Sequence, residues 1–266
     1  MKQYIVDAFT SEPFAGNPAA VCVMDAWPTD AGMMRLAAEN NLSETAFLVR
    51  EAAGWHLRWF TPTTEVTLCG HATLASSFVV LNFVEPDAGG VRFNTLSGEL
   101  IVTREGDHYR MDFPVDAAEE IPVTDDMAAA FGARPSRAFL GMDLLCVFDD
   151  EKTVREMTPD QALLTKLPGR IQNPTAPGAE GSGIDCVSRS FAPKLGIAED
   201  PVCGSAHCLI ADYWARKLGR PSVHAYQASR RGGHLYCNVL GDGRIAISGA
   251  AALVATSEIV ASLDAK

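Results

Sequence analysis

The chain has 266 residues, of which 47% are hydrophobic and 21% charged, and its 33 acidic residues against 22 lysines and arginines give a formal charge of −11. This composition is typical of a globular protein with a substantial core, and the acidity argues against a nucleic-acid-binding protein. The length suits two domains of roughly 130 residues better than one very large core.

Period-2 segments rich in β-branched and aromatic residues predict short strands along the whole chain. They cover Lys2–Ala8, Ala46–Arg50, Trp55–Phe60, Val91–Asn94, Glu99–Arg104, His108–Asp112, Arg137–Gly141, Leu144–Phe148, Gly183–Ser190, Val223–Ala228, His234–Val239 and Arg244–Ser248. Helical spacing is rarer and predicts helices over Thr29–Asn40, His71–Val84, Thr124–Phe131, Pro159–Leu167 and Ser205–Leu218. Many strands joined by hairpin turns favour an α+β fold over a doubly wound sheet.

A proline-containing stretch without periodicity, 114–124, marks the expected domain boundary. We expect residues 1–116 to form an N-terminal half and residues 117–266 a C-terminal half, whose C-terminal tail can pack back on the first half.

Cysteine content and apolar runs bear on the cellular compartment. The seven cysteines are an odd number spread over the chain, so at least one is free. Acidic and proline residues near the N-terminus interrupt any signal-peptide core. The most apolar stretch, residues 245–256, is far shorter than the ~20 residues that cross a bilayer. We expect a cytoplasmic protein with reduced thiols and no membrane partner.

One internal repeat relates the halves. Cys69-Gly70-His71-Ala72 resembles Cys203-Gly204-Ser205-Ala206, and each copy opens a predicted helix. Unpaired N–H groups at two helix starts that face one cleft would hold a substrate carboxylate, and the same field would lower the pKa of each cysteine. Two thiols across a cleft could then racemise or epimerise an amino acid. Buried structural cysteines explain the pattern equally well.

Other residue types add acid–base chemistry. Glu44 stands at the entry to an apolar strand, where desolvation makes a carboxylate a better proton acceptor, and an exposed loop glutamate is the simpler interpretation. His71 could donate to a substrate oxygen, and Asp200 precedes the second helix. A zinc site from Cys69, His71, Cys203 and His207 is conceivable, but this spacing is not a usual zinc motif. We therefore predict no metal.

Familiar motifs are missing from the sequence. It contains no Gly-x-Gly-x-x-Gly, Walker loop, Gly-x-Ser-x-Gly or His-Glu-x-x-His. Dinucleotide oxidoreductases, nucleotide hydrolases, α/β-hydrolases and zincins therefore lose their usual support.

Ordered motifs along almost the whole chain resemble the phenazine-biosynthesis PhzF-like isomerase family. They are Asp7–Thr10, Phe14–Val21, Leu42–Phe47, Arg58–Pro62, Glu65-Val66, Leu68–Ala75, Ser188–Pro193 and Gly196–Val202. The resemblance implies the diaminopimelate epimerase-like fold, in which two pseudo-symmetric α+β halves each wrap a barrel-like, mostly antiparallel sheet around a central helix. It also implies a homodimer without a cofactor that acts on a small carboxylate-bearing, amino-acid-like molecule.

The family's functional residues map onto positions of this chain. The resemblance implies that Glu44 is the general acid/base, supported by His71 and Asp200. It implies substrate binding by Gly70, Gly204 and Ser205.

Cys203 departs from the family, which usually has threonine there, and it places a thiol where related epimerases keep a catalytic cysteine. A PhzF-like isomerase using Glu44 is thus the leading hypothesis. A two-thiol racemase or epimerase using Cys69 and Cys203 is the alternative, and a non-enzymatic metabolite-binding module is the third.

Overall fold

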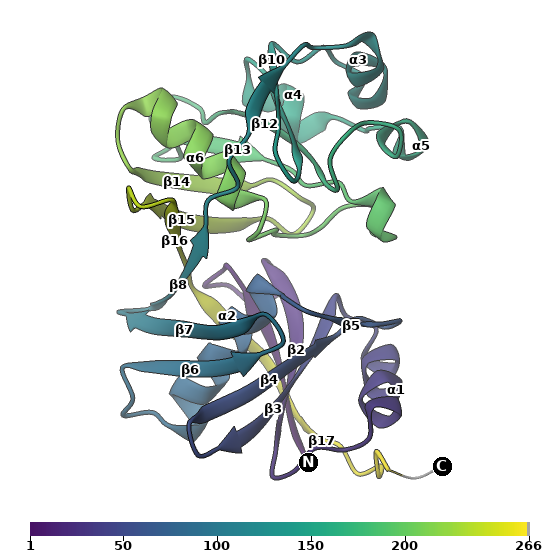
Figure 1. Cartoon of the computed structure of the whole chain (residues 1–266), viewed down its shortest axis with the longest axis vertical. Coiled ribbons are helices and arrows are strands. Elements are labelled where there is room, and N and C mark those ends of the chain that lie inside the picture. Colours follow the sequence, from purple (N-terminus) through teal and green to yellow (C-terminus); the bar gives the residue numbers. More distant parts are fainter. Residues whose placement is uncertain (265–266) are drawn as a thin grey trace. The chain divides into compact units, whose positions relative to one another are not determined.

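The computed structural model describes residues 1–264 and divides the chain into two units (Figure 1). The first unit comprises Met1–Asp112 and the chain from Ser248 onward, and the second comprises Phe113–Ile247. The expected division at 116/117 lies four residues further along the chain, and it assigned the last segment to the second half with its tail packing back on the first half. That segment belongs to the first unit because strand β17 (Ala251–Glu258) pairs antiparallel with strand β1 (Lys2–Ala8).

The first unit is a strongly curved sheet around one helix. Its other strands are β2 (Asn17–Met24), β3 (Glu44–Glu51), β4 (Gly54–Phe60), β5 (Glu65–Val66), β6 (Gly90–Thr95), β7 (Gly98–Glu105) and β8 (His108–Pro114). Its helices are α1 (Asp30–Asn40) and α2 (Gly70–Val79), and α2 continues as a π-helical turn, η1 (Val80–Val84).

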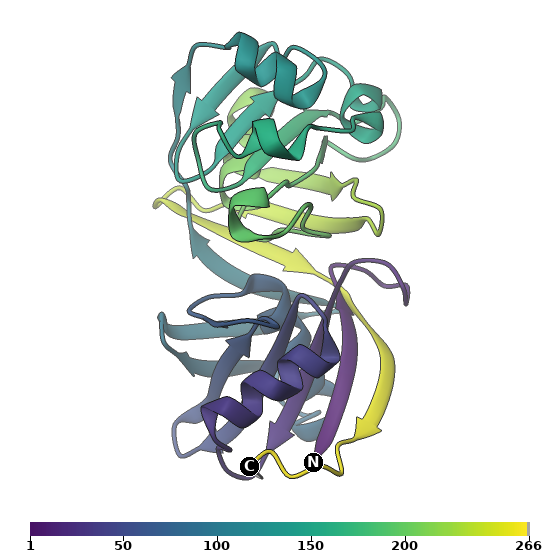
Figure 2. The same ribbon diagram turned by 90° about the vertical axis from the view of Figure 1, so that its right-hand side faces the viewer.

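Helix α2 is the central element of this unit. It packs against β1, β2, β3 and β17, and eight of its ten residues are buried. The small residues Ala72, Ala75, Ser76 and Ser77 let the strands approach its backbone closely. Helix α1 lies on the other side of the sheet, against β3 and β4 (Figure 2).

The second unit repeats the combination of sheet and helix. Its strands are β9 (Glu119–Ile121), β10 (Arg137–Leu140), β11 (Leu144–Val147), β12 (Gln172–Pro177), β13 (Cys186–Ser188), β14 (Ser222–Gln227), β15 (Gly233–Val239) and β16 (Arg244–Gly249). Its helices are α3 (Asp125–Phe131), α4 (Glu151–Glu156), α5 (Gln161–Leu164), the 3₁₀ turn η2 (Pro193–Leu195) and α6 (His207–Leu218). Helix α6 packs on β14 and β15. The α+β class predicted from the sequence is therefore confirmed.

Several elements differ from the prediction for physical reasons. Strand β2 was not predicted, because it lies between β1 and β3 and is buried on both faces, which removes the alternation of polar and apolar residues. The predicted helix over His71–Val84 changes to π geometry after Val79, with the Glu85 N–H bonded to the Val80 carbonyl oxygen at 2.7 Å. Helix α6 begins at His207, two residues later than predicted.

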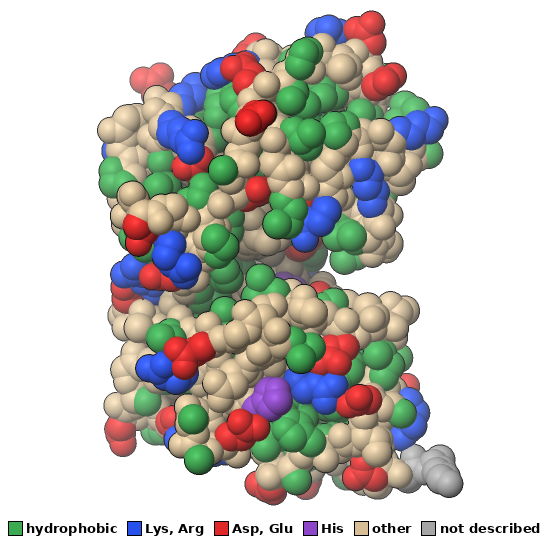
Figure 3. Space-filling view, viewed as in Figure 1, with side chains coloured by type: hydrophobic (Ala, Val, Ile, Leu, Met, Phe, Trp, Pro, Cys, Tyr) green, Lys and Arg blue, Asp and Glu red, His purple; other side chains and the backbone are tan. Residues whose placement is uncertain are grey.

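The surface carries charges of both signs. Acidic and basic side chains are interspersed over the face shown in Figure 3. No helix within residues 1–264 is long and apolar enough to cross a bilayer.

Candidate active site

The first unit brings three predicted site residues together at one edge of its sheet. Strands β2 and β3 are parallel, with Ala19 opposite Glu44, so the starts of both strands lie at the same edge. Helix α2 packs on these two strands. Cys69 and His71 stand at its start, beside Glu44 at the beginning of β3. Gly70, a fourth predicted residue, is the first residue of α2 in the same unit.

Glu44 and His71 form the centre of this site. Glu44 Oε2 lies 3.0 Å from His71 Nε2, and the two side chains are only 13% and 8% exposed. The angles are not those of a hydrogen bond, and neither atom has a hydrogen-bond partner within the part of the chain that the structure describes. The two buried side chains therefore face each other without being joined by a well-aligned hydrogen bond.

The other ring nitrogen of His71 has two neighbours. The Asn17 side-chain amide lies 3.2 Å from Nδ1, and Cys69 Sγ lies 3.5 Å from the same atom. With the amide nitrogen donating to Nδ1, the proton of neutral His71 sits on Nε2, facing Glu44. Rotation of the Asn17 amide by about 180° would place its oxygen opposite a protonated Nδ1. Asn17 can therefore hydrogen-bond to the ring in both of its protonation states.

Asn17 was not singled out by the sequence analysis. It is the first residue of β2 and fully buried. The preceding Gly16 has φ +63°, and a Cβ there would lie 2.2 Å from the Ala8 carbonyl oxygen, so only glycine fits. The Gly-Asn pair within the Phe14–Val21 motif was the available signal, but a contact across 54 residues is not readable from it.

Burial controls the protonation of these groups. Burial, and then the Glu44 carboxylate, raises the pKa of the Cys69 thiol. The expectation that this pKa is lowered is wrong, because burial disfavours the thiolate more than the neighbouring groups stabilise it. Burial also opposes protonation of His71, but the facing side chains of Cys69 and Glu44 outweigh it and raise the pKa of the imidazole well above its usual value.

One group of side chains in the first unit has the donor atoms of a metal site. Glu44, Cys69 and His71 each offer one ligand atom, all within 4.8 Å of one another, and such donors suit zinc. The thiol and the carboxylate, however, contact opposite nitrogens of the His71 ring. One ion could not bind all three without rotation of side chains.

The four-residue zinc set also lacks support, because His207 is fully engaged. Its Nδ1 donates to the Cys203 carbonyl oxygen at 2.7 Å, and its Nε2 lies 3.2 Å from Ser188 Oγ. Burial lowers its pKa to about 4, so the ring is neutral.

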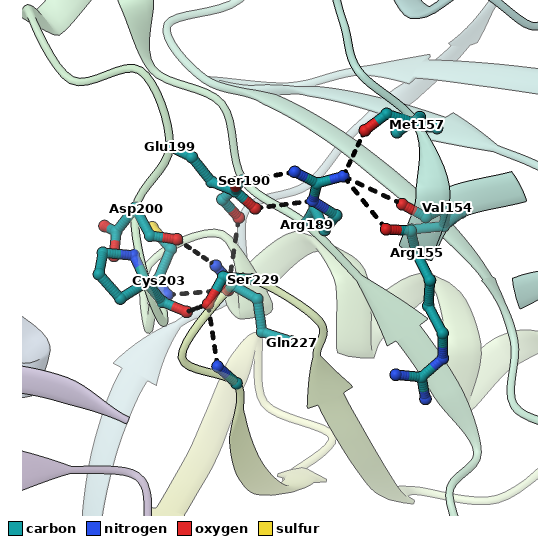
Figure 4. Close-up of polar contacts among 12 residues, drawn as sticks. Val154, Arg155, Met157, Arg189, Ser190, Glu199, Asp200, Cys203, Gln227 and Ser229 are labelled. Atoms are coloured by element: carbon teal, nitrogen blue, oxygen red, sulfur yellow. Dashed lines mark hydrogen bonds and ion pairs between the residues drawn. The ribbon is translucent and has the colours of Figure 1, made fainter. Parts of the chain in front are cut away.

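The second unit holds Asp200, Cys203, Gly204 and Ser205 in the loop before α6, part of which is shown in Figure 4. Cys203 Sγ lies 3.4 Å from Ser205 Oγ, and the Asp200 carboxylate accepts the Val202 N–H at 3.1 Å. Burial, and then Asp200, raises the pKa of the Cys203 thiol well above its usual value. Burial thus opposes loss of the proton from both repeat cysteines.

The segment that follows β13 is held by a second set of contacts, also shown in Figure 4. Arg189 forms two parallel bonds to the Glu199 carboxylate at 2.7 and 2.8 Å and donates to the Met157 carbonyl oxygen at 2.6 Å. Because this bidentate pair is largely shielded from solvent, it holds the backbone that leads into Asp200.

The two repeat cysteines lie at different distances from their helices. Cys69 is the N-cap residue of α2 and makes no side-chain capping bond. Helix α6 begins at His207 with Ala206 as its N-cap, so Cys203 lies four residues before the first helical residue. Within the described chain, the N–H groups without an acceptor include those of Gly70 and His71 in one unit and Gly204 and Ser205 in the other.

Comparison with known proteins defines the class of this fold. The chain is similar in structure to a hydroxyproline epimerase from Agrobacterium vitis, with a TM-score of 0.58 over 97% of this chain and 91% of that one at 11% identity. The fold is thus of the diaminopimelate epimerase-like type.

The family follows from much closer matches. The family model described as phenazine biosynthesis-like protein matches residues 6–257. A PhzF-family protein from Enterococcus faecalis is 46% identical, with a TM-score of 0.94 over 98% of this chain and 99% of that one. An uncharacterised isomerase of Pseudomonas aeruginosa is 48% identical over 93% of this chain and 94% of its own length. The chain belongs to the PhzF-like, phenazine biosynthesis-like family of isomerases, which confirms the resemblance found in the sequence.

Proposed function

We propose that this protein is a cofactor-independent isomerase in which Glu44 moves a proton within a small, carboxylate-bearing, amino-acid-like substrate. The observation that carries the proposal is the buried contact of 3.0 Å between Glu44 Oε2 and His71 Nε2, in which neither atom has another hydrogen-bond partner within residues 1–264. A buried carboxylate with an unoccupied lone pair is free to accept a proton from carbon.

The chemistry requires only that one proton leave and return. Glu44 takes a proton from the carbon next to an activating group, and the electron pair left behind moves into the unsaturated system of the substrate. The same carboxyl then returns the proton to another carbon, so atoms and electrons balance without a second reactant. His71 orients the Glu44 carboxylate through the contact of 3.0 Å between Nε2 and Oε2.

The substrate carboxylate needs donors, and helix starts supply them. The N–H groups of Gly70 and His71 in the first turn of α2, or those of Gly204 and Ser205 in the turn before α6, would receive it, because none of them has an acceptor within the described chain. We also propose, from the resemblance, that Asp200 supports the acid–base step and that the protein is a homodimer.

A two-thiol racemase or epimerase is the second candidate. The 3.5 Å contact of Cys69 Sγ with His71 Nδ1 favours it, because the imidazole could accept the thiol proton. The raised pKa of both thiols counts against it, since a thiol must lose its proton to act as a base.

Solvent-deuterium wash-in tests the proposal. Incubation in D₂O with a panel of small amino-acid-like carboxylates, followed by NMR or mass spectrometry, identifies an accepted substrate. Glu44→Gln should then lower the exchange rate by roughly 10²–10⁴-fold, because an amide of the same size accepts no proton. Glu51→Gln, at the exposed end of the same strand, is the matched control and should retain the rate. Full exchange by Glu44→Gln would refute the proposal.

A further inference from the structure

Gln227 is the fully buried last residue of β14, and it binds the loop that leads into α6. Its Oε1 accepts the Cys203 N–H at 2.9 Å, and its Nε2 donates to the Asp200 carbonyl oxygen at 2.6 Å (Figure 4). Ser190 Oγ also lies within 3.5 Å of Oε1. One side chain therefore fixes both ends of the Asp200–Cys203 segment.

A second tether comes from the hairpin that follows β14. Ser229 Oγ donates to the Pro201 carbonyl oxygen at 2.7 Å and accepts the Gly232 N–H at 3.1 Å. The hairpin is thus closed on itself and bonded to the same loop, so three backbone groups of the loop are held from β14 and its turn.

These bonds decide which N–H groups stay available at the helix start. Gln227 occupies the Cys203 N–H, and the His207 N–H bonds to the Gly204 carbonyl oxygen at 3.1 Å. Within the described chain, the N–H groups of Gly204 and Ser205 remain without an acceptor.

We propose that Gln227 is a positioning residue for carboxylate binding: its amide holds the Asp200–Cys203 segment so that the Gly204 and Ser205 N–H groups point together at one anion. This inference rests on the proposed function, which assigns a carboxylate to these N–H groups. The amide has to be an amide, because it must accept from one backbone group and donate to another at the same time.

The Gln227→Glu variant distinguishes a role of the amide in positioning the Asp200–Cys203 segment from a role in which the side chain only fills space. The introduced carboxylate keeps the size and can accept the Cys203 N–H, but its second oxygen faces the Asp200 carbonyl oxygen and cannot donate to it. Once protonated, the carboxyl can donate again. Burial raises the pKa of such a group, so protonation falls within an accessible pH range.

The experiment follows backbone amide shifts of Gly204 and Ser205 by NMR during titration with acetate and benzoate, at about pH 8 and about pH 5, on either side of the expected pKa of a buried carboxyl. In Gln227→Glu the affinity for acetate and benzoate should fall about tenfold at the higher pH, because an unsatisfied buried polar group usually costs about this much. At the lower pH this affinity should return to within about threefold of the wild-type value. Asp200, Cys203 and His207 are the neighbouring titratable groups and are unchanged, so the wild-type titration corrects for them.

Gln172→Glu is the matched control. Gln172 is equally buried in the same unit, and its Nε2 donates to the Pro168 and Gly169 carbonyl oxygens at 3.3 and 3.2 Å. Its variant should leave the Gly204 and Ser205 titrations unchanged. If Gln227→Glu does not fold, Ser229→Ala, which removes only the bond to Pro201, should lower the affinity by about threefold.

The possible outcomes distinguish failure of the proposed carboxylate site from failure of the proposed role of Gln227. Wild-type amides that ignore every carboxylate would overturn the carboxylate site of the proposed function. Wild-type amides that respond, together with unchanged affinity in Gln227→Glu at the higher pH, would overturn the role of Gln227 alone. Loss of affinity that does not recover at the lower pH would also contradict it.

Discussion

The two Cys-Gly helix starts share a sequence pattern but differ in the groups around them. In the first unit, Cys69 lies beside an imidazole that contacts a buried carboxylate. In the second unit, Cys203 is surrounded by hydroxyl and amide groups, and the buried His207 is kept neutral by its surroundings. Both copies of the repeat therefore keep N–H groups without an acceptor, whereas a carboxylate faces the histidine only in the first unit.

Among the substitutions that test this comparison, the one at His71 is expected to change the rate of deuterium wash-in most. His71→Asn removes the group that faces Glu44 and should lower deuterium wash-in by about 10²-fold or more. His207→Asn, in the second unit, keeps a polar side chain at a site without a facing carboxylate and should change the rate far less after correction for folded protein. Equal losses in both variants would show that the two helix starts are not chemically different.

The two histidines should also give opposite slopes of stability against pH. The pKa of His207 is lowered to about 4 in the folded protein, so the unfolded chain takes up this proton first as pH falls. The free energy of unfolding therefore decreases below about pH 6.5, and the loss reaches about 3 kcal/mol by pH 4. The raised pKa of His71 means that its contribution is present below about pH 6.5 and is lost as pH rises through the folded-state value. Urea unfolding of His71→Gln and His207→Gln against wild type measures both slopes. Slopes of the same sign would contradict the assigned environments.

A smaller effect is expected at Asn17. Asn17→Ala leaves Glu44 and His71 in place but removes the amide that faces Nδ1, so the wash-in rate should fall about tenfold. The pH at which the rate changes should shift as well, because the ring loses a partner that suits both of its protonation states. A changed rate with an unmoved pH profile would point to a purely structural role.

The smallest effects are expected at the cysteines. Cys69→Ser and Cys203→Ser keep a small polar side chain at each position and leave Glu44 and His71 in place, so each should change the wash-in rate by less than about threefold. Strong loss in both variants, with Glu44→Gln active, would establish the two-thiol mechanism instead.

Much of this comparison could be predicted from the sequence. Alternation gave β1 with its observed bounds, and the Cys-Gly repeat located both helix starts. The Leu42–Phe47 motif indicated Glu44. These features depend on neighbouring residues, which is why a single sequence reveals them.

The rest depends on contacts between distant segments. Strand β12 is buried yet polar and contains two prolines, so no periodicity marked it. Asn17 and Gln227 act through residues 54 and 24 positions away. The thiol pKa values were misjudged because burial, which a sequence does not show, disfavours the thiolate more than the neighbouring groups stabilise it.

The most direct test of the central claim is a side-by-side measurement of solvent-deuterium wash-in by Glu44→Gln and Cys69→Ser on one accepted substrate, with carboxylate binding followed in the same samples. The account predicts that Glu44→Gln binds but exchanges roughly 10²–10⁴-fold more slowly, while Cys69→Ser exchanges at nearly the wild-type rate. Exchange retained in Glu44→Gln and lost in Cys69→Ser would contradict it.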